Sequence, residues 1–335
     1  MEWLSKCVNN LYSSSSCPDD CVASCLPPLQ TTSLPSVLTT KQEECSGCMK
    51  PCTLHPIVPT KELQIDQSRP LKNTVPGYAI HFIILTGKTD WPAHLEDEEN
   101  GLAQALIEAI QKDKKKQPTT KWIRDEPNRF LPLRWTTTTT TQMVEQKPNH
   151  RIMVTNASLP SRYSNQRHAH DVILMPDNVI IANVTPRRAT ALLDFVYGCP
   201  SGFVTYPSPY TNLLLVCGHA RKDKRCGTIG PMLLTALEDA LKLCQVEAQV
   251  ALVSHLGGHA FAGNLVIYTH QGQRAIWYGR VTPCHCLDII QQSVVEDRVI
   301  QELLRAVFQA GCAKDTPSPQ QQQQQCVSSA ALLDW

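Results

Sequence analysis

Residues 177–198, DNVIIANVTPRRATALLDFVYG, run parallel to residues 273–294, QRAIWYGRVTPCHCLDIIQQSV, through the shared steps NVTP and RVTP. Each stretch reads as an apolar strand followed by a helix that starts near Pro186 or Pro283, where the missing N–H costs nothing. The match predicts an internal duplication in this chain.

Two more pairs of segments follow the same order upstream. HFIILTGKTDWP (81–92) parallels NLLLVCGHARKD (212–223), and RIMVTNASLP (151–160) parallels QVALVSHLGGHA (249–260). Each copy therefore reads strand, helix, strand, hairpin of two strands, helix. We expect an α/β fold of two β-α-β-β-β-α domains.

The segments between these copies set the expected boundaries. We expect an N-terminal Cys-containing disordered segment, two domains and a disordered Gln-rich tail, at residues 1–42, 43–203, 204–312 and 313–335. The last helix should end near Gly311. KKKQP at 114–118 and the threonine run at 136–141 read as a solvated insertion in the first domain.

Composition describes a soluble globular chain. Of 335 residues, 42% are hydrophobic and 18% charged, and the net charge is +1. Neither a nucleic-acid partner nor a membrane is expected. The first 21 residues have no apolar core of a signal peptide and carry acidic Glu2, Asp19 and Asp20, so we expect a cytosolic protein rather than a mitochondrial or nuclear one.

Four metal-ligand side chains follow predicted strands of the second copy. Cys217 and Cys226 lie in LLLVCGHARKDKRCGTIGP, and His255 and His259 lie in VSHLGGHAFAGN. Strand ends meet at one edge of an α/β sheet, so the two pairs can converge. Two thiolates and two imidazoles suit tetrahedral zinc, and they also suit a two-iron two-sulfur cluster.

The corresponding positions of the first copy are Thr86 and Asn156, so only the second copy can hold such a cofactor. The closest alternative ligands in the second copy are His219, which could also supply a hydrogen bond behind a ligand, and the run Cys284, His285, Cys286.

The surroundings of the four ligands are basic and glycine-rich. Arg221, Lys222, Lys224 and Arg225 outnumber Asp223 between the cysteines, which favours either an acidic partner or a merely solvated loop. The glycines at 257 and 258 predict a tight loop between the histidines.

These motifs, CGHARKDKRCGTIGP, SHLGGHAFAGNLVIY and WYGRVTP, resemble the sucrase/ferredoxin-like family, whose fungal members are thioredoxin-like ferredoxins. The resemblance covers roughly residues 45 to 310 and includes CSGCMKPCTLHP in the first copy. It implies two thioredoxin-like domains and a two-iron two-sulfur cluster on Cys217, Cys226, His255 and His259. The function it implies is a cytosolic one-electron carrier, possibly coupled to proton transfer, with donor and acceptor unknown.

Cysteines near the N-terminus leave other functions open. Cys45 and Cys48, followed by Cys52, could form the dithiol of a thiol-disulfide oxidoreductase, and a zinc-stabilised scaffold is a third reading. Neither a Ser-His-Asp set nor a carboxylate pair stands out, so no catalytic residue is assigned and an electron-transfer role is favoured over catalysis.

The chain ends in Leu333, Asp334 and Trp335. This tripeptide resembles the C-terminal signal by which client proteins engage the cytosolic iron-sulfur assembly targeting complex. An aromatic anchor beside a terminal carboxylate fits C-terminal capture. We therefore expect this complex as a partner.

Overall fold

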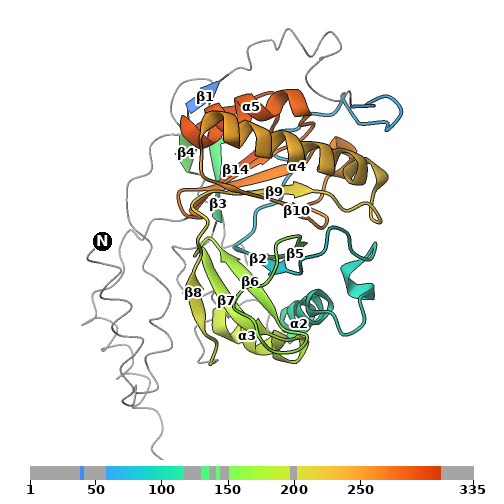
Figure 1. Ribbon diagram of the computed structural model, residues 1–335, viewed down its shortest axis with the longest axis vertical. Helices are drawn as coiled ribbons and strands as arrows, with labels where there is room; N and C mark the ends of the chain where they lie inside the picture. The colour runs from blue at the N-terminus through green and yellow to red at the C-terminus, as the bar shows by residue number, and fades with distance from the viewer. Residues whose placement is uncertain are drawn as a thin grey trace, which may run out of the picture.

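Strands from both halves of the chain join in one mixed sheet of twelve strands, covered by few helices (Figure 1). The computed structural model describes residues 38–40, 58–116, 130–135, 141–143, 151–196 and 202–310. The N-terminal cysteines, residues 136–140 and the Gln-rich tail with its Leu-Asp-Trp end lie outside these residues. Among the described residues, no helix is both long and apolar enough to cross a membrane.

The elements of the first half are β2 (Ile80–Leu85), η2 (Leu95–Asp97), α2 (Leu102–Lys116), β3 (Phe130–Trp135), β4 (Thr141–Met143), β5 (Ile152–Ala157), β6 (His170–Met175), β7 (Val179–Val184), η4 (Pro186–Arg188), α3 (Ala189–Val196) and β8 (Thr205–Pro207). A short strand, β1 (Leu38–Thr40), precedes them.

The elements of the second half are β9 (Leu213–Cys217), α4 (Lys224–Cys244), β10 (Gln249–Val253), η5 (His259–Phe261), β11 (Leu265–Thr269), β12 (Arg274–Tyr278), η6 (Pro283–His285), α5 (Cys286–Ile289), the π-helical η7 (Ile290–Val295), β13 (Arg298–Ile300) and β14 (Leu304–Ala310).

The two halves pair their strands in the same way. Strand β2 is parallel to β5 and antiparallel to β6, and β9 is parallel to β10 and antiparallel to β11. The α/β class is therefore confirmed as a large mixed sheet. The division into two duplicated domains stays a prediction, because β5 and β10 also pair with each other through Ala157 and Val253.

Strand β2 is buried on both faces, which explains its continuous apolar sequence. Ile80, Phe82 and Ile84 pack into a core with helices α2 and α3. The alternate residues Ile83 and Leu85 pack into the larger core that contains β9 to β12 and α4. Helices α4 and α5 lie on one side of the molecule, and α2 and α3 lie on the opposite side (Figure 1).

A buried chain of hydrogen bonds crosses the contact between the halves. The indole N–H of Trp277 donates to the hydroxyl of Tyr78 at 3.2 Å, which lies 3.2 Å from the hydroxyl of Tyr268. That hydroxyl lies 2.6 Å from His81 Nδ1, and His81 Nε2 lies 2.9 Å from Thr155 Oγ1. The indole of Trp277 can only donate, so each hydroxyl in the chain can accept from one neighbour and donate to the next. In this order Tyr78 donates to Tyr268, and Tyr268 donates to Nδ1 of a neutral His81.

The end of the second half differs from the expectation. In place of a helix ending near Gly311, residues 298–300 and 304–310 form β13 and β14, and β14 pairs with β12 and β3. All seven residues of β14 are buried. A short run buried on both faces cannot be told from a buried helix by its period, which accounts for the error.

The expected solvated insertion is also partly wrong. Helix α2 continues through Lys116 and so includes part of the KKKQP run. Strands β3 and β4 flank the threonine run and extend the sheet beyond β14. Strand β4 begins at Thr141, the last residue of the threonine run, and composition alone did not reveal this strand.

Acid should weaken the contact between the halves through His81. Burial lowers the pKa of His81 to about 3 from 6.5, so the unfolded chain binds a proton that the folded protein does not. The free energy of unfolding should therefore fall as the pH drops from about 6.5 towards 3, with a slope of up to ~1.4 kcal/mol per pH unit from this group. Urea unfolding at several pH values measures it.

The variant His81→Gln removes this titration while it keeps a donor and an acceptor. The difference in unfolding free energy between wild type and variant should shrink as the pH falls below 6.5. His94→Gln, at an exposed position, is the control and should leave the curve parallel to that of the wild type. Parallel curves for His81→Gln would contradict the assignment.

Candidate cofactor site

Cys217 and Cys226 lie next to each other at the end of β9 and the start of α4. Their residues are 1% and 0% exposed. The backbone N–H of Cys217 donates to the carbonyl of Asn264 at 3.0 Å, which fixes the strand end. A Cβ at Gly230 would lie 2.7 Å from the carbonyl oxygen of Cys217, so glycine allows α4 to pack directly on this backbone.

A hydrogen bond joins the two thiols. The hydrogen bond from Cys226, with a smaller contribution from His255, holds the pKa of Cys217 well below its usual value although burial opposes this. The same hydrogen bond, together with burial, raises the pKa of Cys226. Cys217 is therefore the first of the two to become a thiolate, the form that binds metals.

His255 and His259 form the second pair. His255 follows β10, His259 opens η5, and their ring centroids lie 5.4 Å apart. His255 is half-buried and His259 is exposed. The Nδ1 atom of His255 is buried without a hydrogen-bond partner. Buried polar atoms in proteins rarely lack a hydrogen-bond partner, so this nitrogen is available to bind a metal ion or a ligand.

His219 has a different role from the four candidates. Its Nε2 lies 3.0 Å and 2.9 Å from the carbonyl oxygens of Trp91 and Pro92, so this nitrogen carries the proton. Its Nδ1 accepts the backbone N–H of His255 at 3.2 Å. Both ring nitrogens are occupied, and His219 orients the loop that carries His255.

Arg305 of β14 holds the same loop from inside the protein. It is 2% exposed, and its guanidinium donates to the carbonyl of Gly257 at 3.0 Å and to Asn264 Oδ1 at 2.7 Å. It also donates to Thr74 Oγ1 at 2.9 Å. Burial lowers the pKa of Arg305 to about 10, while the nearby cysteines oppose the shift, so it stays charged at neutral pH.

Sequence reasoning missed Arg305, Asn264 and Thr74. The signal that was available for the first of these is a charged residue inside an apolar run, since such a residue is rarely buried without partners. Nothing in the chain order indicated that residues near 74 would reach the loop at 257.

The remaining predicted residues lie around this site with other partners. Asp223 accepts from the backbone N–H of Arg225 at 2.9 Å and so caps α4, and it forms an ion pair with Arg225 at 2.8 Å. Arg221 pairs with Asp90 at 3.6 Å. Two of the basic residues between the cysteines are therefore paired with carboxylates.

Within the run at 284–286, His285 and Cys286 make hydrogen bonds at the start of η6. His285 Nδ1 accepts the backbone N–H of Thr282 at 3.0 Å, and the Cys286 thiol donates to the carbonyl of Thr282 at 3.6 Å. These contacts complete the start of η6 rather than the thiol and imidazole pairs.

Cys217 interacts with both Cys226 and His255, and the centroid of the His255 ring lies 5.4 Å from that of His259. Within the described part of the chain, no three His, Cys, Asp or Glu side chains are grouped to hold one metal ion. A tetrahedral zinc ion needs such a group. A two-iron two-sulfur cluster takes two protein ligands on each iron, and pairs of Cys and of His meet that need. Two thiols and two imidazoles are the donor set that a two-iron two-sulfur cluster with two histidine ligands would use.

The fold and the site together define a mixed α/β protein that brings two thiols and two imidazoles together at the carboxyl ends of two neighbouring strands, β9 and β10. The chain belongs to the sucrase/ferredoxin-like family, whose profile matches residues 71–306.

The matching relatives include proteins of three species that are named "Altered inheritance of mitochondria protein 32". The protein of Debaryomyces hansenii is 32% identical over 47% of this chain and 66% of its own length. That of Clavispora lusitaniae is 47% identical over 29% of this chain and 35% of its own length. That of Saccharomyces cerevisiae is 38% identical over 27% of this chain and 30% of its own length. No solved structure matches the chain.

These findings correct the expected function and location. The relatives are named for the inheritance of mitochondria and not for electron transfer, so the cytosolic one-electron carrier is wrong, as is the cytosolic location. The Cys45/Cys48 oxidoreductase finds no support in these names, and the grouping of ligands does not fit a zinc scaffold. The spacing of ligands indicates what converges in a fold but not the process it serves.

The loop between the histidines depends on glycine at residue 258. Gly258 has φ +73°, and a Cβ there would lie 2.4 Å from Arg305 Nη2. Gly258→Ala should therefore lower the free energy of unfolding by about 2–4 kcal/mol, from backbone strain plus overpacking. Chemical denaturation measures the change.

Gly257→Ala is the matched control. Gly257 has φ +83°, but a Cβ there would have nothing within 4 Å. This variant should show only the backbone cost of about 1–2 kcal/mol. Equal losses in the two variants would mean that the contact with Arg305 does not constrain the loop.

Proposed function

We propose that this chain binds a two-iron two-sulfur cluster through Cys217, Cys226, His255 and His259 and that it acts in the inheritance of mitochondria. The carrying observation is the pairing at one sheet edge of two buried thiols with two imidazoles, one of which has a buried nitrogen without a partner. The part in mitochondrial inheritance comes from the names of the relatives.

The chemistry of this chain's own side chains supports the cofactor. The cysteine pair already favours one thiolate, because Cys226 lowers the pKa of Cys217. Arg305 places a buried positive charge by the same loop, which offsets the negative charge of thiolate ligands. A cluster with two histidine ligands supplies a site that accepts one electron more readily than a cluster with four cysteines.

A thioredoxin-like duplication is the finer fold that we propose. The same order of strand, helix, strand, hairpin and helix occurs in β2 to α3 and in β9 to α5, with β3 and β4 inserted in the first copy. The shared parallel and antiparallel pairings support this origin. The two copies then differ in cofactor binding, since Thr86 stands where the second copy has Cys217, and Ala157, next to Asn156, stands where it has His255.

Anaerobic reconstitution with iron and sulfide tests the cofactor. The full chain should take up two irons and two sulfides per molecule and give a visible absorption band. Cys217→Ala should lose this uptake, because the second thiol alone leaves one iron with a single protein ligand. Cys244→Ala, a half-buried cysteine at the end of α4, should retain it. Zinc bound in place of iron and sulfide would refute the proposal.

The C-terminal tripeptide is proposed to bind the iron-sulfur assembly targeting complex. Removal of Leu333, Asp334 and Trp335 should lower the iron content of protein made in cells that have this complex. It should leave reconstitution of the purified chain unchanged. A matched change just before it, Leu332→Ala, should have no effect on either measurement. An equal iron content in the truncated protein would exclude this role.

Complementation tests the part in mitochondrial inheritance. The chain, expressed in Saccharomyces cerevisiae that lacks its relative, should restore the fraction of daughter cells that receive functional mitochondria. His255→Ala should fail to restore it, because the site would lose the imidazole whose nitrogen lacks a partner. Microscopy of labelled mitochondria in mother and daughter pairs measures the fraction.

Cys244→Ala is again the control and should restore inheritance as the unmodified chain does. Western blotting establishes that all variants are present at equal levels. Full restoration by His255→Ala would show that this process does not use the cofactor site.

A further inference from the structure

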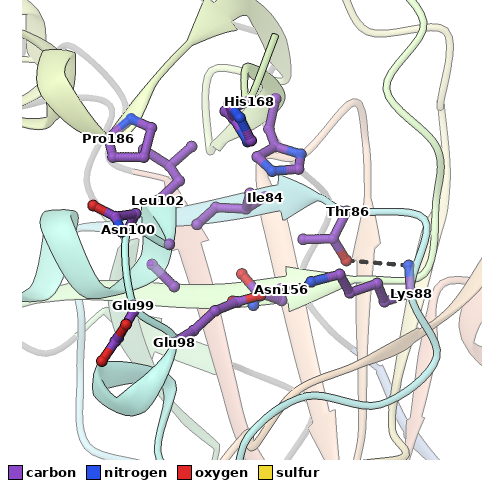
Figure 2. A pocket seen from close by; sticks show the side chains of 13 residues that line it. Ile84, Thr86, Lys88, Glu98, Glu99, Asn100, Leu102, Asn156, His168 and Pro186 are labelled. Atoms are coloured by element: carbon purple, nitrogen blue, oxygen red, sulfur yellow. Dashed lines mark hydrogen bonds and ion pairs between the residues drawn. The ribbon is translucent and has the colours of Figure 1, made fainter.

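A second site lies in the first half of the chain, at the carboxyl ends of strands β2 and β5. A pocket of about 310 Å³ opens there between these strands, the start of α2 and the segment before β6 (Figure 2). Its lining includes Thr86, which directly follows β2, and Asn156, the next-to-last residue of β5. Ligands of α/β sheets bind at such strand ends.

Asn156 provides the decisive observation. Its residue is 1% exposed, and both its side-chain Oδ1 and its Nδ2 are buried without a hydrogen-bond partner. Its backbone is fully used, since the N–H donates to Ser254 Oγ at 2.9 Å and the carbonyl accepts from the N–H of Ser254 at 2.9 Å. A carboxamide left unpaired on both atoms in the wall of a pocket calls for a ligand that offers one donor and one acceptor.

The charges around the pocket have both signs. Lys88 Nζ lies 2.6 Å from Glu98 Oε1, which uses one of the three donors of this ammonium. The N-terminus of α2, a helix of 15 residues, also faces this region and favours negative groups. Glu99 is exposed at the rim and favours positive groups. Figure 2 shows these side chains around Asn156 and Ile84.

We propose that this pocket binds a small zwitterion of the amino-acid type, with its carboxylate near Lys88 and the start of α2 and its ammonium near Glu98 and Glu99. Such a molecule satisfies both atoms of Asn156 at once, because its carboxylate accepts from Nδ2 and its ammonium donates to Oδ1. A simple anion would satisfy only Nδ2. The volume is at the lower limit for ligand pockets, which suits a molecule of this size and excludes a nucleotide.

This site is argued without the cofactor, so the two proposals can fail separately. Isothermal titration calorimetry on the full chain compares glycine, glutamate, glutamine and lysine with acetate, methylammonium and inorganic phosphate. At least one amino acid should bind saturably with one molecule per chain, at least tenfold more tightly than acetate, methylammonium or phosphate.

Two variants test the assigned groups. Asn156→Leu should weaken binding at least tenfold, while its thermal unfolding temperature stays equal or rises, because two unpaired buried polar atoms are removed. Lys88→Met should also weaken binding at least tenfold. If Asn156→Leu does not fold, the affinity of Lys88→Met tests the proposal instead. Lys112→Met, on the exposed part of α2 beyond the pocket, is the control and should bind as the wild type does.

Three results would overturn the proposal. The first is that no amino acid binds at millimolar concentration. The second is that phosphate or acetate binds as tightly as any amino acid, which would make this a plain anion site. The third is that a folded Asn156→Leu or Lys88→Met variant binds with unchanged affinity.

Discussion

The buried hydrogen-bond chain from Trp277 through Tyr78, Tyr268 and His81 to Thr155 is the contact on which the rest of the structure depends. It runs through an otherwise apolar contact, where a polar group without its partner costs free energy. Its members come from both halves of the chain: Trp277 and Tyr268 from the second, and Tyr78, His81 and Thr155 from the first. Apolar packing on both faces of β2 supplies the stability, and the hydrogen bonds select the register.

The cofactor site depends in turn on the end of the described chain. Strand β14 carries Arg305 into the interior, where its guanidinium binds the loop between the two histidines and the strand end next to Cys217 through Asn264. A single buried cation thus connects both ligand pairs. Its burial is tolerated because the carbonyl of Gly257, the amide oxygen of Asn264 and the hydroxyl of Thr74 accept its hydrogen bonds.

Local patterns predicted the order of the elements and the convergence of the site but not the contacts that hold it. Strand period and strand ends indicated that Cys217 and His255 would meet, since those features are local in sequence. The contacts of Arg305 with Thr74 and Gly257 join segments far apart in the chain, and no period encodes them. The sequence also failed to predict that Leu304–Ala310 forms a strand. Both faces of this strand are buried, so it lacks the alternation of apolar and polar residues that identifies a strand.

The two strand-end sites meet at one junction of the sheet. Strands β5 and β10 are antiparallel to each other and pair only through Ala157 and Val253, near the carboxyl end of each. Just beyond this pair, the backbone N–H of Ser254 donates to the carbonyl of Asn156, and the hydroxyl of Ser254 accepts from the backbone N–H of Asn156. Ser254 directly precedes His255. A shift of the β5 end would therefore displace the residue next to His255, one of the proposed cofactor ligands. The amide of Asn156 on one side suits hydrogen-bonding ligands, and the thiol and imidazole groups on the other suit transition metals, so the two proposed sites would take different ligands although they share a backbone contact.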